Sequence, residues 1–283
     1  MSTSLPGQCN AGAGDAFVRK YDAASGDEIW TREFGTQLPD AVAGLAVDGG
    51  AVFVLAGQNL AKLVSASAAD SAPRIRNECV LNAASNIGGG VVPGEIVTVL
   101  VAGDVARLLF NGVPAPILVA SEERITAVVP LELAGQTTVD IRVESRDAAS
   151  EAVTLPVLPE RLGFFSADRS GDGQAAIVNE DGSLNRPDHP ARPGSVISIF
   201  GTGGSAHAVR VAISSEIIAF PEVDGGEEDF RYYAPILYVG PGGGVLQINM
   251  RVPSGVPSGG AVPLHIISGG MRIEQSLTIA IGQ

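Results

Sequence analysis

Short runs in which apolar and polar residues alternate recur along the whole chain, and glycine and proline separate them. In the first part, DAFVRKYDA and EIWTREFG flank a turn at Ser25-Gly26-Asp27, and AVAGLAVDGG, AVFVLAGQ and LAKLV follow. A period of two residues places alternate side chains on opposite faces of a β-strand. Residues 15–65 are therefore predicted to form four or five short strands.

An internal repeat is the clearest signal in the rest of the chain. PGEIVTVL begins at Pro93 and PGSVISIF at Pro193, with the same alternation after the same Pro-Gly. Further on, APILVASEERITAVVP at 115–130 matches APILYVGPGGGVLQINMRVP at 234–253, and each copy continues through a glycine-containing turn into more strand pattern. Two divergent copies of one β unit therefore occupy the last two thirds of the chain, each with the short strands and turns of an antiparallel sandwich.

These patterns predict an all-β fold. A propeller-blade-like N-terminal sheet at 1–75 ends in an Ala-, Ser- and Asp-rich linker, since the strand content there matches about one blade. Two tandem immunoglobulin-like β-sandwiches follow at 76–158 and 159–283. The second copy carries a segment at 204–230 that has no match in the first, and this segment is interpreted as an insertion.

The N-terminal part resembles the SBBP-type β-propeller repeat. The residues that carry the resemblance are LPGQ, Gly14-Asp15-Ala16-Phe17-Val18, Lys20-Tyr21-Asp22, Trp30-Thr31-Arg32, Phe34-Gly35-Thr36 and Gly44-Leu45-Ala46-Val47-Asp48. The chain holds one such repeat, whereas a blade is stabilised by neighbours that cover its faces. The resemblance implies either a truncated propeller or a lone sheet packed on the next domain.

The first sandwich resembles the IPT/TIG-type immunoglobulin-like domain of surface proteins, through CVLNAASNIGGGVVPGEIVTVL, LLFNGVPAPILVAS, ITAVVPLELAGQTTVDIRVES and VTLPV. The second is similar to the C-terminal module of large exported acidobacterial proteins, through GQAAIVNEDGSLNRPDHPARPGSVISIFGTG and GVLQINMRVPSGVPSGGAVPLHI. These resemblances imply a fold and an extracellular or cell-surface location within a longer exported precursor, and no chemistry. MSTSLPGQ has no basic and apolar leader pattern, so a cytoplasmic protein is the expectation if Met1 is the true start.

The net charge and the apolar content of the chain exclude several classes of binding partner. The formal net charge is −13, and none of the three predicted domains is basic, which disfavours nucleic acid and anionic lipid surfaces. No apolar run approaches the roughly 18–20 residues of a membrane span, so membrane insertion is not expected. The two cysteines, Cys9 and Cys79, either form one disulfide or stay as separate buried thiols.

A loop in the second copy resembles the start of a calcium site. Asp168, Ser170 and Asp172 fall at positions 1, 3 and 5 of an EF-hand-like spacing with glycine at position 6, but Asn179 stands where a bidentate carboxylate belongs. An Asp-, Ser- and Gly-rich turn also caps its own backbone without a metal. Calcium is the one cofactor that the sequence suggests, and the alternative is a turn without metal.

Phe230, Tyr232 and Tyr233 form a dense aromatic group in a chain with 5% aromatic residues. Tyrosine combines apolar area with a hydrogen-bonding hydroxyl, so these residues are a candidate platform for sugar or peptide. The alternative places Tyr232 or Tyr233 in the core or against the neighbouring domain.

Catalytic signals are weak. Gly201-Thr202-Gly203-Gly204-Ser205-Ala206 imitates a dinucleotide fingerprint, but no βαβ pattern follows it. The three histidines, His189, His207 and His265, are scattered, and the acidic run from Glu222 to Asp229 is typical of a solvated loop. We therefore expect no enzyme.

The sequence predicts a non-catalytic structural or adhesive module of a secreted or cell-surface bacterial protein. The alternative is a carbohydrate- or peptide-binding domain that uses the Phe230–Tyr233 region, with calcium as a possible aid. A protein or a glycan at the cell surface is the expected partner. Because uncovered strand edges template pairing, the N-terminal sheet is predicted either to form a homodimer through residues 15–65 or to be covered by the sandwich that follows it.

Overall fold

The computed structural model describes residues 16–34, 41–48, 51–56, 59–64, 73–103, 105–121, 123–204, 209–213, 232–242, 244–268, 271–273 and 275–283. The chain divides into two compact units. The first comprises Met1–Leu81, Asn86–Val91 and Val97–Val157, and the second comprises Asn82–Ser85, Val92–Ile96 and Leu158–Gln283. Two short segments of the first repeat therefore belong to the second unit.

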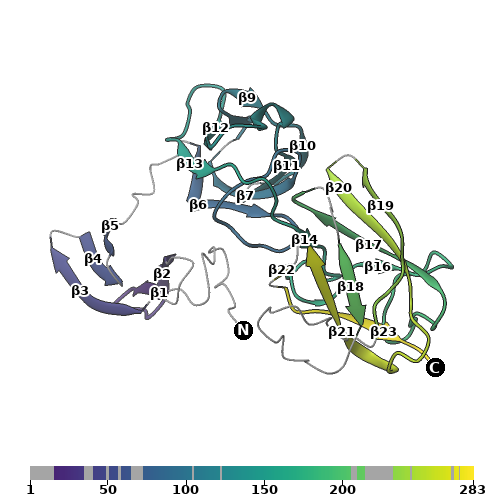
Figure 1. Ribbon diagram of the computed structural model, residues 1–283. Helices are drawn as coiled ribbons and strands as arrows, with labels where there is room; N and C mark the ends of the chain where they lie inside the picture. Colours follow the sequence, from purple (N-terminus) through teal and green to yellow (C-terminus); the bar gives the residue numbers. More distant parts are fainter. Residues whose placement is uncertain are drawn as a thin grey trace, which may run out of the picture. The chain divides into compact units, whose positions relative to one another are not determined.

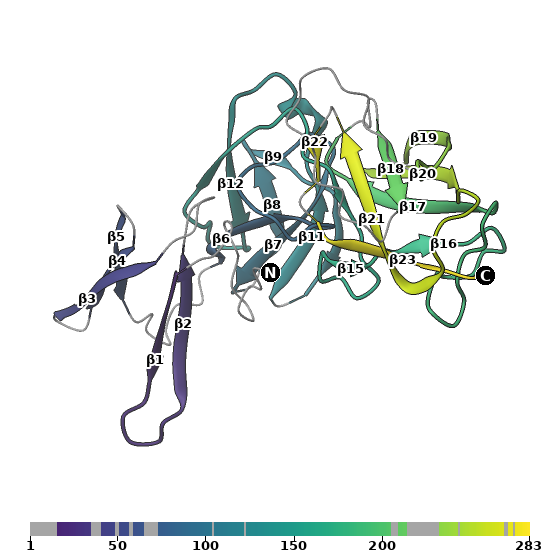
Figure 2. The same cartoon turned by 60° about the horizontal axis from the view of Figure 1, so that its bottom comes forward.

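The N-terminal strands pair in two antiparallel sheets in the described part of the chain (Figures 1 and 2). One is the hairpin of β1 (Ala16–Tyr21) and β2 (Glu28–Phe34), and the other joins β3 (Val42–Asp48), β4 (Ala51–Ala56) and β5 (Asn59–Val64). Asp22 Oδ1 accepts the N–H groups of Ala24 and Ser25 and so caps the first turn. The strands predicted for 15–65 are present, and the homodimer through them stays a prediction.

The first sandwich consists of two four-stranded sheets, in the orders β10-β11-β7-β6 and β13-β12-β8-β9. Its elements are β6 (Arg74–Asn82), β7 (Ile96–Ala102), β8 (Arg107–Phe110), β9 (Val113–Pro114), β10 (Ile117–Ala120), β11 (Arg124–Val128), the 3₁₀ turn η1 (Leu131–Leu133), β12 (Thr138–Glu144) and β13 (Val153–Pro156). In β12, Val139, Ile141 and Val143 face the core while the residues between them face outward. The apolar residues of the predicted alternation are therefore the buried ones, and the polar residues between them are exposed.

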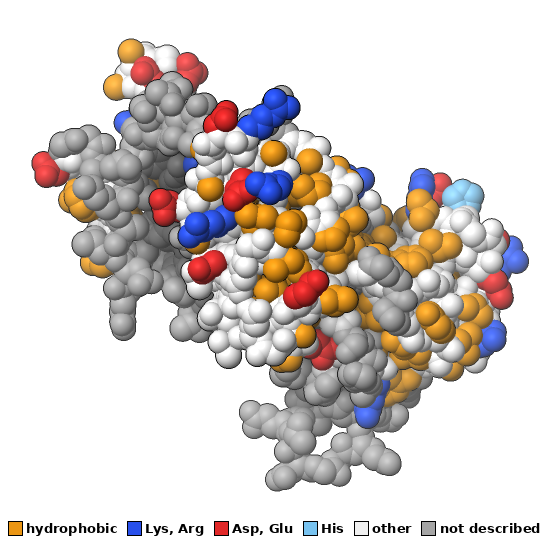
Figure 3. All heavy atoms as spheres, turned by 90° about the horizontal axis from the view of Figure 1, so that it is seen from above, with side chains coloured by type: hydrophobic (Ala, Val, Ile, Leu, Met, Phe, Trp, Pro, Cys, Tyr) orange, Lys and Arg blue, Asp and Glu red, His pale blue; other side chains and the backbone are white. Residues whose placement is uncertain are grey.

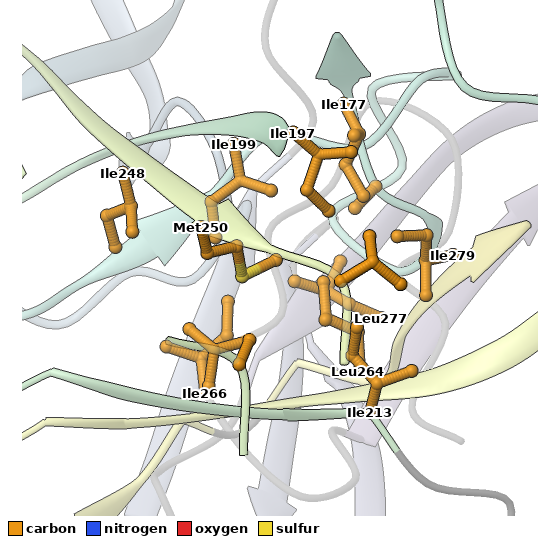
Figure 4. Packing of buried hydrophobic residues seen from close by; sticks show 14 of the residues in the cluster. Ile177, Ile197, Ile199, Ile213, Ile248, Met250, Leu264, Ile266, Leu277 and Ile279 are labelled. Atoms are coloured by element: carbon orange, nitrogen blue, oxygen red, sulfur yellow. The ribbon is translucent and has the colours of Figure 1, made fainter. Parts of the chain in front are cut away.

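The second sandwich has the sheet orders β14-β17-β20-β19, with β16 on β17, and β15-β23-β21-β18, with β22 on β21. Its strands are β14 (Gly163–Phe164), β15 (Gly173–Gln174), β16 (Ile177–Val178), β17 (Val196–Thr202), β18 (Arg210–Ile213), β19 (Ile236–Gly242), β20 (Val245–Arg251), β21 (Gly259–Ser268), β22 (Met271–Arg272) and β23 (Leu277–Ile281). Figure 4 shows Ile197, Ile199, Ile248 and Met250 pointing toward the side chains of the opposite sheet. The all-β, two-sandwich architecture is as predicted.

The segment predicted as an insertion contains one strand of the second sandwich. β18 pairs with β21, and Val211 and Ile213 are fully buried in the core. β8 of the first copy pairs with β12 in the same way, so β18 is its counterpart. Apart from Gly204 and residues 209–213, the rest of 204–230 lies outside the described residues.

Two buried side-chain amides form paired hydrogen bonds with strand backbone in the second sandwich. Gln275 accepts the N–H of Phe164 and donates to its carbonyl, both at 2.7 Å. Asn185 does the same for Ala280, at 2.8 and 2.9 Å. Each amide thereby pairs with both the N–H and the carbonyl of one strand residue, on the side that the neighbouring strand does not cover in the case of Phe164. Among the described residues, no helix has the length and apolar character that crossing a membrane requires.

Candidate functional site

In the predicted calcium loop, Asp168 accepts hydrogen bonds from serine and backbone groups of the loop itself. Asp168 Oδ1 lies 2.7 Å from Ser170 Oγ and 3.1 Å from Ser166 Oγ, and it accepts the Ser170 N–H at 3.0 Å. The pKa of Asp168 is lowered, first by the hydroxyl of Ser170 and then by its N–H. Asp172 Oδ1 accepts the N–H of Ser276 at 2.7 Å. In the described residues no group of three or more His, Cys, Asp or Glu gathers as a metal site.

We therefore expect millimolar calcium to leave the melting temperature of the chain unchanged, because the loop is already capped by serine and backbone donors. Differential scanning fluorimetry with calcium, with magnesium and with a chelator measures this. A calcium-specific rise that disappears in Asp168→Asn would instead establish a metal site.

The residues of the predicted aromatic platform do not form one exposed surface among the described residues. Tyr232 is half-buried and packs against the hydrophobic core of the second unit. Tyr233 is also half-buried, and its backbone forms an antiparallel bridge to Ala212. Phe230 lies outside the described residues. The two tyrosines thus border the end of β18, and Tyr232 contributes to the core.

The glycine-rich segment after Phe200 serves close packing of backbone. A Cβ on Gly203 would overlap the carbonyl oxygen of Arg161, and Gly203 has φ +95°. A Cβ on Gly201 would lie 3.0 Å from Phe164 Cδ1, and Gly201 pairs with Phe164 in the ladder. These glycines admit the strand β14, which explains a fingerprint-like spacing without a nucleotide.

The remaining sequence candidates are dispersed. Cys79 is buried and disulfide-bonded, while Cys9 lies outside the described residues. His265 lies buried in β21, where burial first and Arg272 second lower its pKa. His189 is exposed on a turn beside Asp188, and His207 and the acidic run lie outside the described residues.

A β-bulge in the edge strand β19 turns two adjacent side chains outward. Ile236 pairs with Met250 and Tyr238 with Asn249, so Leu237 is the extra residue. Ile236 and Val239 pack against the core, whereas Leu237 and Tyr238 are 52% and 48% exposed. A bulge places two residues opposite one and re-aims their side chains.

The ring of Tyr238 lies along its own strand over Gly240. A Cβ on Gly240 would overlap the Tyr238 hydroxyl and lie 2.9 Å from its Cε1. Residues two apart in a strand share a face, so a glycine at 240 leaves room for the ring to lie flat. The hydroxyl end of the ring therefore lies over Gly240, and about half of the Tyr238 side chain is open to solvent.

A hydrogen-bonded polar row continues from Tyr238 across the sheet. Asn249 stands opposite both Tyr238 and Ser198. Its Oδ1 accepts the Ser198 hydroxyl at 2.9 Å and Gln247 Nε2 at 2.8 Å. Phe200, opposite Gln247, is half-buried on the same face. We call Ser198, Phe200, Leu237, Tyr238, Gln247 and Asn249 the outward strip.

The first copy carries different chemistry at the same place. β10 has the same bulge, with Ile117 opposite Ala127 and Val119 opposite Thr126. When the repeats are aligned, Val119 of the first copy occupies the position of Tyr238 in the second. Thr126 likewise corresponds to Asn249, and Leu100 corresponds to Phe200. The face drawn in Figure 3 shows hydrophobic side chains in patches with charged groups between them. Aromatic and amide groups at this position thus belong to the second copy.

A buried carboxyl in the second unit titrates near neutrality. The Glu95 side chain has no exposed surface, and its Oε1 lies 3.4 Å from Arg161 Nη2. Burial raises the pKa of Glu95 to about 7, and Arg161 and the Asn82 amide partly oppose this shift. Since no solvent reaches the carboxyl, it acts on stability and not on a ligand.

Sequence reasoning missed both Tyr238 and Glu95. Tyr238 lies in an alternating run that places it on the core face, and only the bulge reverses this. Glu95 follows a Pro-Gly turn, where exposure is the ordinary expectation, and the aligned residue in the second copy is Ser195. The repeat alignment held one usable signal, namely the change of Val119 to Tyr238.

Comparison with solved structures finds distant likenesses. The SGBP-B protein of the Bacteroides ovatus mixed-linkage glucan utilization locus, in complex with a mixed-linkage heptasaccharide, has 11% identity and a TM-score of 0.35 over 95% of this chain. Domains 4–9 of the surface layer protein SbsC have 14% identity and a TM-score of 0.25 over 98% of this chain, and the titin Ig tandem A164-A165 has 12% and 0.22 over 75%. The chain spans 60%, 40% and 97% of these three chains, respectively. At these TM-scores the likeness is no guide to function. No protein-family model and no curated protein matches the chain.

Proposed function

We propose that the chain is a non-catalytic adhesive module of a secreted or cell-surface bacterial protein, and that its second sandwich carries the ligand-binding face. The observation that carries this proposal is the outward strip. The aromatic and amide side chains of this strip occur in one copy of the repeat, on a sheet whose other face is anchored in a closed core by Ile199, Ile248 and Met250. A binding surface on such a sheet is held in place before the ligand arrives.

The two sandwiches suit a structural role beside binding. Each has its own apolar core, with fully buried residues such as Phe110 and Ile141 in the first and Ile197 and Ile248 in the second. Packed cores of this kind make stiff units that space or present a binding surface. The SBBP-type and IPT/TIG-type resemblance, and the location outside the cell, remain parts of this proposal that rest on the motifs quoted above.

The proposal predicts retention without turnover. The full chain, incubated with immobilised cell-envelope material and with a panel of insoluble polysaccharides, is expected to be retained on at least one of them. The same mixtures are expected to release no soluble reducing ends. Release of sugar products in proportion to protein would overturn the non-catalytic assignment, and a chain recovered unbound from every surface would overturn the adhesive one.

A further inference from the structure

We infer that the outward strip binds a neutral saccharide chain, with Tyr238 as the stacking platform and Asn249 and Gln247 as hydrogen-bonding groups. This inference rests on the proposed function and gives it a ligand class and a site. The site differs from the predicted Phe230–Tyr233 platform, because Tyr232 packs against the core while the side chain of Tyr238 is about half exposed.

The ring of Tyr238 has the geometry that sugar stacking needs. It is 48% exposed, and its hydroxyl end lies over Gly240, a residue without a side chain that could cover the ring. A pyranose ring presents C–H groups on its faces and hydroxyls around its rim. An aromatic face therefore covers the apolar side of the sugar while leaving the hydroxyls to polar partners.

The polar row supplies those partners in a fixed orientation. Because Asn249 Oδ1 already accepts from Ser198 and Gln247, the amide is turned so that its Nδ2 is left to donate. Within the described residues Asn249 Nδ2 and Gln247 Oε1 have no partner in the hydrogen-bond network. One free donor and one free acceptor match a hydroxyl group, which needs both.

Charge selects a neutral ligand. None of the six residues of the strip is Asp, Glu, Lys, Arg or His, and the nearby Arg251 donates its Nη1 to the Gly194 carbonyl at 2.7 Å. The chain as a whole carries a net charge of −13. The net charge therefore repels polyanions such as uronates, and none of the six residues of the strip offers them a cation.

The direction of the strip favours a saccharide over a peptide. Tyr238, Asn249 and Ser198 lie in one row across three strands, a span of roughly 10 Å at the usual strand spacing. A peptide captured by the edge strand β19 would run parallel to it and would use backbone groups. The groups of the strip are side chains aligned across the strands, which fits a chain lying across the sheet face.

The test uses the full chain and affinity electrophoresis in gels containing galactomannan, xyloglucan, dextran or polygalacturonate. Retardation by at least one neutral polysaccharide, and none by polygalacturonate, is expected. Tyr238→Ala is expected to weaken that binding at least about tenfold, as for a central aromatic anchor, and Asn249→Ala about fivefold. Gly240→Ala, which touches no ligand, is expected to weaken it as well by lifting the ring.

Val119→Ala is the matched control, because Val119 occupies the corresponding bulged position of the first copy and is 64% exposed. Its binding is expected to equal that of the unchanged chain, and thermal melts of all variants verify folding. If a neutral polysaccharide binds but Tyr238→Ala and Asn249→Ala bind equally well, the strip is overturned and the adhesive function stands. Stronger retardation by polygalacturonate overturns the neutral class. If no neutral polysaccharide retards the chain, or if an extended peptide competes at the strip, the saccharide assignment is overturned.

Discussion

Glu95→Gln is expected to raise the free energy of unfolding at pH 8 by about 3 kcal/mol while leaving it unchanged at pH 4. The carboxyl has no exposed surface, and burial raises its pKa from 4.5 to about 7. Glutamine has the shape of the protonated carboxyl and can keep a hydrogen bond with Asn82. The glutamine variant therefore resembles the chain with a protonated Glu95, which is the protonation state that burial favours.

The sign follows from proton binding. Below pH 4.5 the carboxyl is protonated in both folded and unfolded chains, so its contribution does not change with pH. Between pH 4.5 and about 7 the folded chain holds more protons than the unfolded chain, so stability falls as pH rises. Above about pH 7 both states are ionised, and the lost stability is constant.

Urea denaturation followed by circular dichroism at a series of pH values measures this profile. Glu144→Gln is the matched control, since Glu144 pairs with Arg107 at 2.8 Å on the surface of the first sandwich. An exposed pair of this kind contributes less than about 1 kcal/mol. Parallel pH profiles of the unchanged chain and Glu95→Gln would show that the pKa of the carboxyl does not rise on folding, because Arg161 and the Asn82 amide offset the burial.

Gln275→Leu is expected to destabilise the chain by about 3 kcal/mol or more, even though leucine fills a similar volume. The amide of Gln275 pairs with both backbone groups of Phe164 and donates to the carbonyl of Gly171. Leucine leaves these groups buried without a partner, at a cost of about 1–3 kcal/mol each.

The midpoint of urea unfolding checks this second prediction. Ser276→Ala is the control, because the neighbouring Ser276 is exposed and only its backbone N–H bonds to Asp172. Its effect is expected to stay within about 0.5 kcal/mol. A loss below about 1 kcal/mol in Gln275→Leu would mean that water replaces the amide at β14.

Residue pattern alone determined the class of fold. The alternation in β12, β17 and β20 is repeated in the burial of Ile141, Ile199 and Ile248, because a strand in a sandwich has one face in the core. The repeat from Pro93 and Pro193 predicted two similar units, since similar patterns of core residues close similar sheets. β18 escaped this reasoning because its short RVAI run has little identity with the RLLF of β8.

Only the tertiary structure decided which residues a ligand can reach and which charges are buried. The bulge at Leu237 depends on pairing with β20, and it turns Tyr238 from the core face to the outward face. Glu95 and Arg161 are 66 residues apart in the sequence. The Glu95 carboxyl is buried because segments 82–85 and 92–96 are part of the second unit. Exposure and pairing of this kind are properties of contacts between distant segments, so neither follows from the local alternation that determines the strands themselves.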